Sequence, residues 1–284
     1  MQTITHFKGD TTVPIEVERP IVLSAAYIDH LLTIDEVPLA VNTEPRYGAD
    51  YPEYLAEYLN DVQLIGSAEE PSLEKISELD PDVIFVESRT SDQHYDQLTK
   101  IAPTIVLGNE WLEYEDDPNF WTKDLLKVAE VFNKVELAEE KIEELKIRTT
   151  EVEQKVEELE HKKLGYLRIR DSLMQVYAKG GHPMNTMLYE ELGFAPTDLT
   201  PDLERADYSL ELIPILDADY LVLDVDPGAS DTLETIYESN MWQQISAVEE
   251  QNVWESDSYW LFKGWGFIGR NQILDDIEEL IKSE

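Results

Sequence analysis

The chain has 284 residues, of which 42% are hydrophobic, so it can form one large domain or two modest ones with real cores. It contains no cysteine, which excludes disulfides, thiol catalysis, iron–sulfur clusters and zinc–thiolate sites. Its 61 acidic and 22 basic residues give a formal net charge of −39, which excludes nucleic acid as a partner because phosphate contacts need clustered lysine and arginine. Such a surface suits salty or alkaline surroundings, where screening limits self-repulsion.

Short apolar runs alternate with helical patterns through the first 130 residues. We expect strands over 21–23, 39–41, 82–86 and 104–107. Between them lie amphipathic stretches, including a helix over 72–79 with Ser72 as its N-cap. This alternation predicts a mainly parallel α/β sheet, and we assign residues 1–134 to a first lobe.

Residues 135–162 have a different composition, without glycine or proline and dense in Glu, Lys and Leu. Their apolar residues recur at spacings of 3, 4 and 7, which is the period of a helix. Thr149 and Thr150 interrupt the pattern, so a coiled coil is not favoured. We predict one rigid helix that bridges two lobes.

A second set of strands and helices follows this helix. Strands are expected over 164–169, 174–178, 220–225 and 252–255, and helices near 185–192, 209–216, 232–239 and 267–282. We assign residues 163–284 to a second α/β lobe.

The residues that follow the predicted strands are candidates for a binding site, because ligands of open α/β sheets bind beyond the carboxyl ends of the strands. Arginine is scarce, with eight residues in the chain. Four of them lie at or near these strand ends: Arg46, Arg89, Arg168 and Arg170. Their planar guanidinium groups suit carboxylates and other oxyanions, which indicates an anionic ligand. The alternative is that they pair with the abundant surface carboxylates.

Aromatic residues near the same strand ends could supply the flat walls of a ligand cleft. They are Tyr27, Tyr47, Trp111, Tyr177 and Trp260. The chain has six Trp and 14 Tyr, so each of these residues can equally belong to the core or the rim.

Several short stretches follow one another in a characteristic order. They are 19–23 and 39–41, 71–76 and 79–84, 101–104, Trp121 before the long helix, 188–194, 208–211 and 219–220, and 242–254. In this order and spacing, over almost the whole chain, the sequence resembles iron-siderophore substrate-binding proteins of ABC importers.

The resemblance implies two α/β lobes with mainly parallel sheets, joined by one long helix, in the class III periplasmic-binding-protein fold. It implies a ferric siderophore held between the lobes, with the iron bound by the chelator, no intrinsic cofactor and no catalysis. The ligand-binding roles that it implies fall on Arg168, Arg170 and Arg89, and less directly on Arg46, Tyr177, His182 and Trp260.

The resemblance also implies a partner and a location. Glu74 and Glu211 match the glutamates that dock, one from each lobe, onto the permease dimer of the importer. The protein is expected to be an extracytoplasmic monomer. We expect a lipid anchor on the outer face of the cell membrane in a full-length precursor, since this chain lacks the signal and the lipid-bearing cysteine.

Other ligands on the same scaffold stay open at this point, haem or a corrinoid among them. A bare metal ion is not favoured, because the five histidines are scattered along the sequence. Several arginines suit a citrate-based carboxylate–hydroxamate siderophore, while catecholates, hydroxamates and ferric citrate remain open.

A small-molecule enzyme and an interaction protein built on the long helix are alternatives of other classes. Residues 264–269 match the dinucleotide pattern G-x-G-x-x-G. Only 15 residues follow Gly269, too few for the βαβ unit that this pattern requires. We therefore interpret the glycines as a tight turn into the last helix. An interaction protein built on the long helix would need regular heptads of exposed apolar residues, and the apolar pattern of this helix is too interrupted for that.

Overall fold

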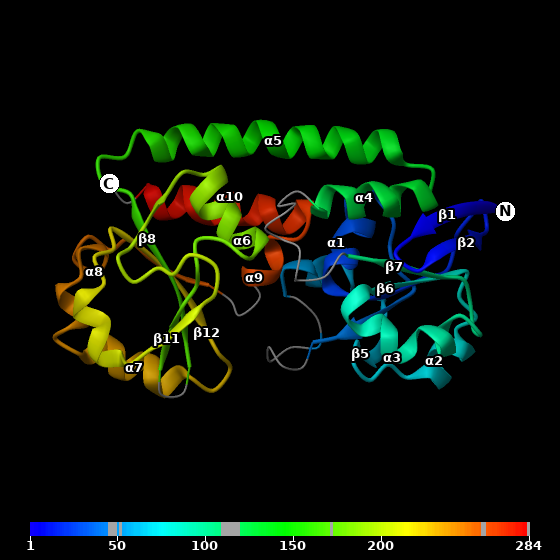
Figure 1. Ribbon diagram of the computed structural model, residues 1–284, viewed down its shortest axis with the longest axis horizontal. Coiled ribbons are helices and arrows are strands. Elements are labelled where there is room, and N and C mark those ends of the chain that lie inside the picture. The colour runs from blue at the N-terminus through cyan, green and yellow to red at the C-terminus, as the bar shows by residue number, and fades with distance from the viewer. Residues whose placement is uncertain (45–49, 51–52, 109–119, 171–172, 257–259, 283–284) are drawn as a thin grey trace. The chain divides into compact units, whose positions relative to one another are not determined.

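The computed structural model describes residues 1–44, 50, 53–108, 120–170, 173–256 and 260–282 (Figure 1). The chain forms two compact units. The first contains Met1–Glu144 and Trp265–Gly269, and the second contains Leu145–Gly264 and Arg270–Glu284. Among the described residues, no helix is both long and apolar enough to cross a bilayer.

The first unit contains a parallel five-stranded sheet in the order β5-β4-β3-β6-β7. Its central strand reads Pro-Ile-Val-Leu and is buried throughout, as expected of a parallel strand covered on both faces. The strands are β3 (Pro20–Leu23), β4 (Ala40–Thr43), β5 (Gln63–Ser67), β6 (Val83–Glu87) and β7 (Thr104–Leu107). The helices are α1 (Ala25–Thr33), η2 (Glu53–Tyr58), α2 (Leu73–Glu78), α3 (Ser88–Leu98) and α4 (Phe120–Val131).

The four strands predicted for this unit are present, with bounds shifted by at most two residues. An antiparallel hairpin of β1 (Gln2–His6) and β2 (Gly9–Val13) and the edge strand β5 were not predicted. Ser72 precedes α2 as its N-cap, but its side chain makes no capping hydrogen bond.

The second unit contains a mixed six-stranded sheet in which β11-β9-β8-β12-β13 are neighbours and β10 pairs with β8. Pairs β8–β12, β12–β13 and β8–β10 are parallel, while β9 is antiparallel to β8 and β11. The strands are β8 (Lys163–Ile169), β9 (Met174–Val176), β10 (Ala195–Pro196), β11 (Ala206–Tyr208), β12 (Tyr220–Val225) and β13 (Val253–Ser256). The fold class predicted from the sequence, two α/β units with mainly parallel sheets, is confirmed.

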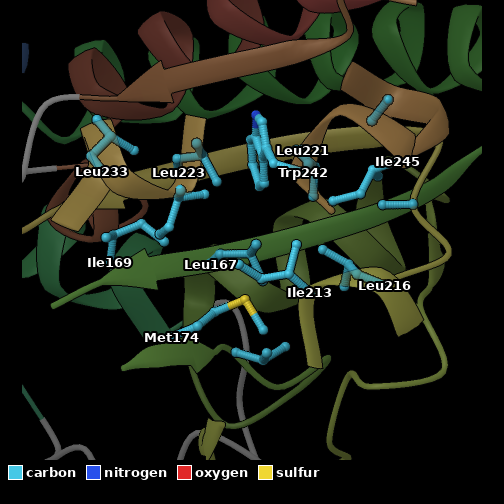
Figure 2. Packing of buried hydrophobic residues seen from close by; sticks show 14 of the residues in the cluster. Leu167, Ile169, Met174, Ile213, Leu216, Leu221, Leu223, Leu233, Trp242 and Ile245 are labelled. Carbon is cyan, nitrogen blue, oxygen red and sulfur yellow. The ribbon is translucent and has the colours of Figure 1, made fainter. Parts of the chain in front are cut away.

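Leucines of β8 and β12 pack with Met174, Ile213 and Trp242 in the core of this unit (Figure 2). The helices are α6 (Pro183–Thr186), the π-helix η3 (Met187–Glu191), η4 (Leu210–Ile215), α7 (Ser230–Glu238), η5 (Trp242–Gln244), α8 (Ser246–Glu249), α9 (Trp260–Lys263) and α10 (Phe267–Ile281). The four helices predicted here correspond to α6 with η3, η4, α7 and α10.

One long helix, α5 (Val135–Glu157), follows the first unit, as predicted, but it ends five residues before the expected position 162. Its buried residues follow the helical period: Ala138, Ile142, Leu145, Thr149, Val152 and Val156. Thr149 fits this face because its Oγ1 donates to the carbonyl of Leu145 at 2.9 Å. The compact units divide within α5, between Glu144 and Leu145.

The start of α10 requires glycine. The Asp29 carboxylate of α1 accepts hydrogen bonds from the backbone N–H of Ile268 (3.1 Å) and Gly269 (2.9 Å), which caps the helix. A Cβ on Gly266 would lie 2.2 Å from Asp29 Cγ, and a Cβ on Gly264 would lie 3.0 Å from the backbone nitrogen of Met184. The glycines therefore serve a tight turn into the helix, as the sequence indicated.

Candidate functional site

In the first unit, polar side chains gather where the neighbouring parallel strands β4, β3 and β6 end. Glu44 follows β4, Ser24 follows β3, and Glu87 is the last residue of β6. Arg89 lies in the first turn of α3, and its Nη2 and Nε lie 2.9 and 3.1 Å from Glu87 Oε1. Ser24 Oγ donates to the other oxygen of Glu87 at 3.3 Å. Arg89, one of the two arginines predicted for this unit, therefore lies near the strand ends, where it is paired with a carboxylate.

Glu44 is half-buried beside this pair. It accepts a hydrogen bond of 2.7 Å from Asn42 Nδ2. Burial raises the pKa of Glu44 to about 7, and the charge of Glu87 adds to the rise. Burial also raises the pKa of Glu87, while Arg89 opposes that rise. The strand ends of the first unit thus hold carboxylates whose ionised forms are disfavoured.

Tyr27 lies in the core of the first unit. Its side chain is buried, and its hydroxyl donates to Asp124 of α4 at 3.4 Å. A Cβ on Gly108, which follows β7 with φ +76°, would lie 2.5 Å from that hydroxyl. Burial raises the pKa of Asp124 to about 7. This placement corresponds to the core alternative that the sequence left open for Tyr27.

In the second unit, Arg168 and Arg170 meet one carboxylate. Asp226 follows β12, and its two oxygens lie 2.5 Å from Arg168 Nε and 3.5 Å from Arg170 Nε. Arg168 lies within β8 and opposite Asp224 in the register with β12, so both arginines stand at the carboxyl ends of these parallel strands. The structure therefore brings the two predicted arginines together, again as ion pairs.

A second carboxylate, Asp224, is buried next to this group. It accepts hydrogen bonds from Tyr166 (2.9 Å), Ser256 (2.5 Å) and Tyr177 (3.4 Å). The Tyr177 ring stacks on Tyr166 with centroids 4.2 Å apart. These hydroxyl donors compensate the burial of the carboxylate.

Tyr177, His182 and Trp260 are buried in the second unit, with exposed fractions of 4%, 6% and 0%. Trp260 Nε1 donates to Asp276 at 2.6 Å, and His182 Nδ1 accepts from the N–H of Met184 as the N-cap of α6. Burial lowers the pKa of His182 to about 3, so its ring is neutral. In this structure the three side chains pack within the second unit. Arg46, Tyr47 and Trp111 lie outside the described residues.

Glu87 and Asp226, which pair with the arginines, and the nearby carboxylates Glu44 and Asp224 were not predicted as site residues. The available signal was their position, since each stands at a strand end beside one of the arginines. Within the described part of the chain, no group of three or more His, Asp or Glu residues could hold a metal ion. The arrangement offers hydrogen-bond donors and acceptors for a bound molecule.

The profile of the family described as "Periplasmic binding protein" matches residues 21–259. The petrobactin-binding protein YclQ of Bacillus subtilis (strain 168) is 25% identical and aligns with 96% of this chain and 85% of its own length. The probable siderophore-binding lipoprotein YfiY of the same strain is also 25% identical, over 98% of this chain and 86% of that protein.

Solved structures show the same fold. The crystal structure of YclQ superposes with a TM-score of 0.80 at 21% identity, over 100% of this chain and 99% of that one. The structure of Staphylococcus aureus SirA complexed with staphyloferrin B superposes with a TM-score of 0.75 at 20% identity, over 99% of each chain. Because the family profile spans both sheets, the chain belongs to the periplasmic binding protein family.

Proposed function

We propose that this chain is the extracytoplasmic substrate-binding component of an ABC importer and that its ligand is a ferric siderophore. The observation that carries the proposal is the family match over residues 21–259, which includes the strand ends of both units. Relatives that align with nearly the whole chain are named for petrobactin and siderophore binding. The role is capture and delivery, without catalysis.

Arg168 and Arg170 are the residues that we propose for the chelate oxygens, with Arg89 as the counterpart in the first unit. Arginine has five N–H donors in a planar fork, so it can bond a carboxylate and an oxygen of the ligand at once. The ion pairs with Asp226 and Glu87 orient the guanidinium groups before the ligand binds. Under this proposal the iron is held by the chelator, and the protein recognises the outer oxygens of the complex.

Tryptophan fluorescence tests the proposal, because the chain has six tryptophans. We expect quenching by at least one member of a panel of ferric carboxylate, hydroxamate, catecholate and citrate complexes. Arg168→Ala should weaken that binding at least about tenfold, because it removes a partly buried charged contact. Arg19→Ala is the control, since Arg19 lies at the opposite, amino end of β3 and pairs with Asp80. Quenching only by haem or a corrinoid would refute the ligand class.

We further propose that Glu74 and Glu211 dock onto the permease dimer and that the protein is a monomer held to the outer face of the membrane by a lipid anchor. Both glutamates are exposed in the first turn of a short helix, Glu74 on the first unit and Glu211 on the second. Changing both to alanine should leave ligand binding intact and abolish uptake by cells. Uptake at the wild-type rate would contradict the docking role.

A further inference from the structure

Among the described residues of the first unit, Glu44 is a strand-end carboxylate that stands apart from the ion pair of Glu87 and Arg89. Among the described residues, no basic side chain lies within ion-pair distance of it, and its one side-chain hydrogen bond comes from Asn42. The charged groups that face it are Glu87 of β6, Glu69 between β5 and α2, and Arg89 of α3. Arg89 is already held by Glu87 at 2.9 Å. The described groups around Glu44 therefore leave its negative charge largely uncompensated.

Asn42 provides a second, independent observation. Asn42 is fully buried in β4, and its Nδ2 donates a hydrogen bond to Glu44. Its Oδ1 is buried and has no hydrogen-bond partner among the described residues. Buried polar groups are nearly always paired, so an unpaired carbonyl oxygen beside a ligand-binding face indicates a partner that arrives with the ligand.

The Glu44 carboxylate and Asn42 Oδ1 are both acceptors. The complementary group must therefore donate hydrogen bonds, and a positive charge on it would be compensated by Glu44. A carboxylate or phosphate at this position would be repelled by Glu44, Glu87 and Glu69. We propose that Asn42 and Glu44 form a subsite for a protonated amine of the siderophore, and that Glu44 selects amine-bearing ligands over their acylated forms.

This inference rests on the proposed function and names the part of the ligand that the first unit recognises. The sequence indicated a wholly anionic ligand. The subsite instead calls for a ligand that has oxygens to accept from the arginines and an ammonium group to pair with Glu44. The pKa of Glu44, raised to about 7 by burial and by Glu87, adds a pH dependence. Between pH 6 and pH 8 the carboxylate loses its proton, so affinity for an ammonium group should rise across that range.

A pair of probes with the same iron centre tests the subsite. Ferrioxamine B is a ferric tris-hydroxamate with a free primary amine, and its N-acetyl derivative lacks that charge. At pH 8 the wild type should bind the amine form about tenfold more tightly, as expected of a partly buried ion pair. Glu44→Gln should reduce the ratio to about one and leave affinity for the acetylated form unchanged within about threefold, which also shows that the variant is folded.

Glu70→Gln is the matched control, because it removes one exposed carboxylate from the loop between β5 and α2 and should keep the wild-type ratio. The ratio should also grow from pH 6 to pH 8 in the wild type and stay constant in Glu44→Gln. Any of three results would overturn the subsite and leave the proposed function standing. They are equal affinity of the wild type for the two probes, an undiminished ratio in Glu44→Gln, and binding restricted to ferric siderophores without an amine. Failure to bind any ferric siderophore would instead refute the proposed function.

Discussion

Gly266→Ala should destabilise the protein through one buried carboxylate. The added Cβ would lie 2.2 Å from Asp29 Cγ and 2.4 and 2.6 Å from its two oxygens, so the carboxylate must move. Asp29 is fully buried, and its oxygens accept from the backbone N–H groups of Ile268 and Gly269 and from Thr33 Oγ1. Moving the carboxylate therefore removes the cap of α10.

The magnitude follows from the two N–H groups that lose their acceptor. Each unsatisfied buried donor costs about 1–3 kcal/mol, so the loss of two should lower the free energy of unfolding of Gly266→Ala by about 2–6 kcal/mol. Asp29→Ala should cost a similar amount for the same reason. In the Asp29→Ala background the clash is gone, so adding Gly266→Ala should cost less than about 1 kcal/mol. The two substitutions are thus expected to be strongly non-additive.

Urea unfolding of the four proteins, followed by far-UV circular dichroism at pH 8, measures this cycle. Gly228→Ala is the control, because a Cβ there meets no atom within 4 Å. Its φ of +92° strains an alanine, so only a backbone cost of about 1–2 kcal/mol is expected. Additive costs for Asp29→Ala and Gly266→Ala would refute the argument that the glycine exists to admit the carboxylate.

Two further predictions concern pH and salt. Burial raises the pKa of Asp29 from 3.8 to about 6, so the folded state binds the proton more tightly than the unfolded state. The stability of the wild type relative to Asp29→Asn should therefore fall by about 2 kcal/mol between pH 4 and pH 7, measured by urea unfolding. A constant or rising difference would contradict the assignment. The net charge of −39 predicts that the thermal unfolding midpoint rises when NaCl is increased from about 0.1 to about 1 M. The reason is that the Debye length falls from about 10 to about 3 Å, which screens the repulsion between carboxylates. An unchanged midpoint would show that this repulsion does not limit the stability.

The central strands could be predicted because burial on both faces leaves a continuous apolar run. β3 and β7 read Pro-Ile-Val-Leu and Thr-Ile-Val-Leu, and all their residues are buried. The hairpin of β1 and β2 reads Gln-Thr-Ile-Thr-His and Gly-Asp-Thr-Thr-Val, with one buried residue in each strand. Such short, polar strands are stabilised by pairing and by tertiary contacts, which one sequence does not display.

The positions of Arg89, Arg168 and Arg170 near strand ends could be predicted from the sequence, because strand ends follow from the apolar pattern. Their partners could not, since the pairing of Arg168 with Asp226 depends on the register of β8 against β12. The same limit applies to the aromatic residues. Tyr177 and Trp260 stand near strand ends in the sequence, but each packs against Tyr166 in the core.

The pairing of the arginines changes what their scarcity implies. In a chain of net charge −39, free guanidinium groups at the strand ends would attract any anion. Arg89, Arg168 and Arg170 are instead each held by a carboxylate, so an incoming anion gains less Coulomb energy than free cations would supply. What remains is a set of oriented donors at Arg168 and Arg170 and a set of acceptors at Glu44. Under the proposed function and subsite, a ligand that bonds the arginines but carries no ammonium group would leave Glu44 and the buried Asn42 oxygen without a donor from the ligand.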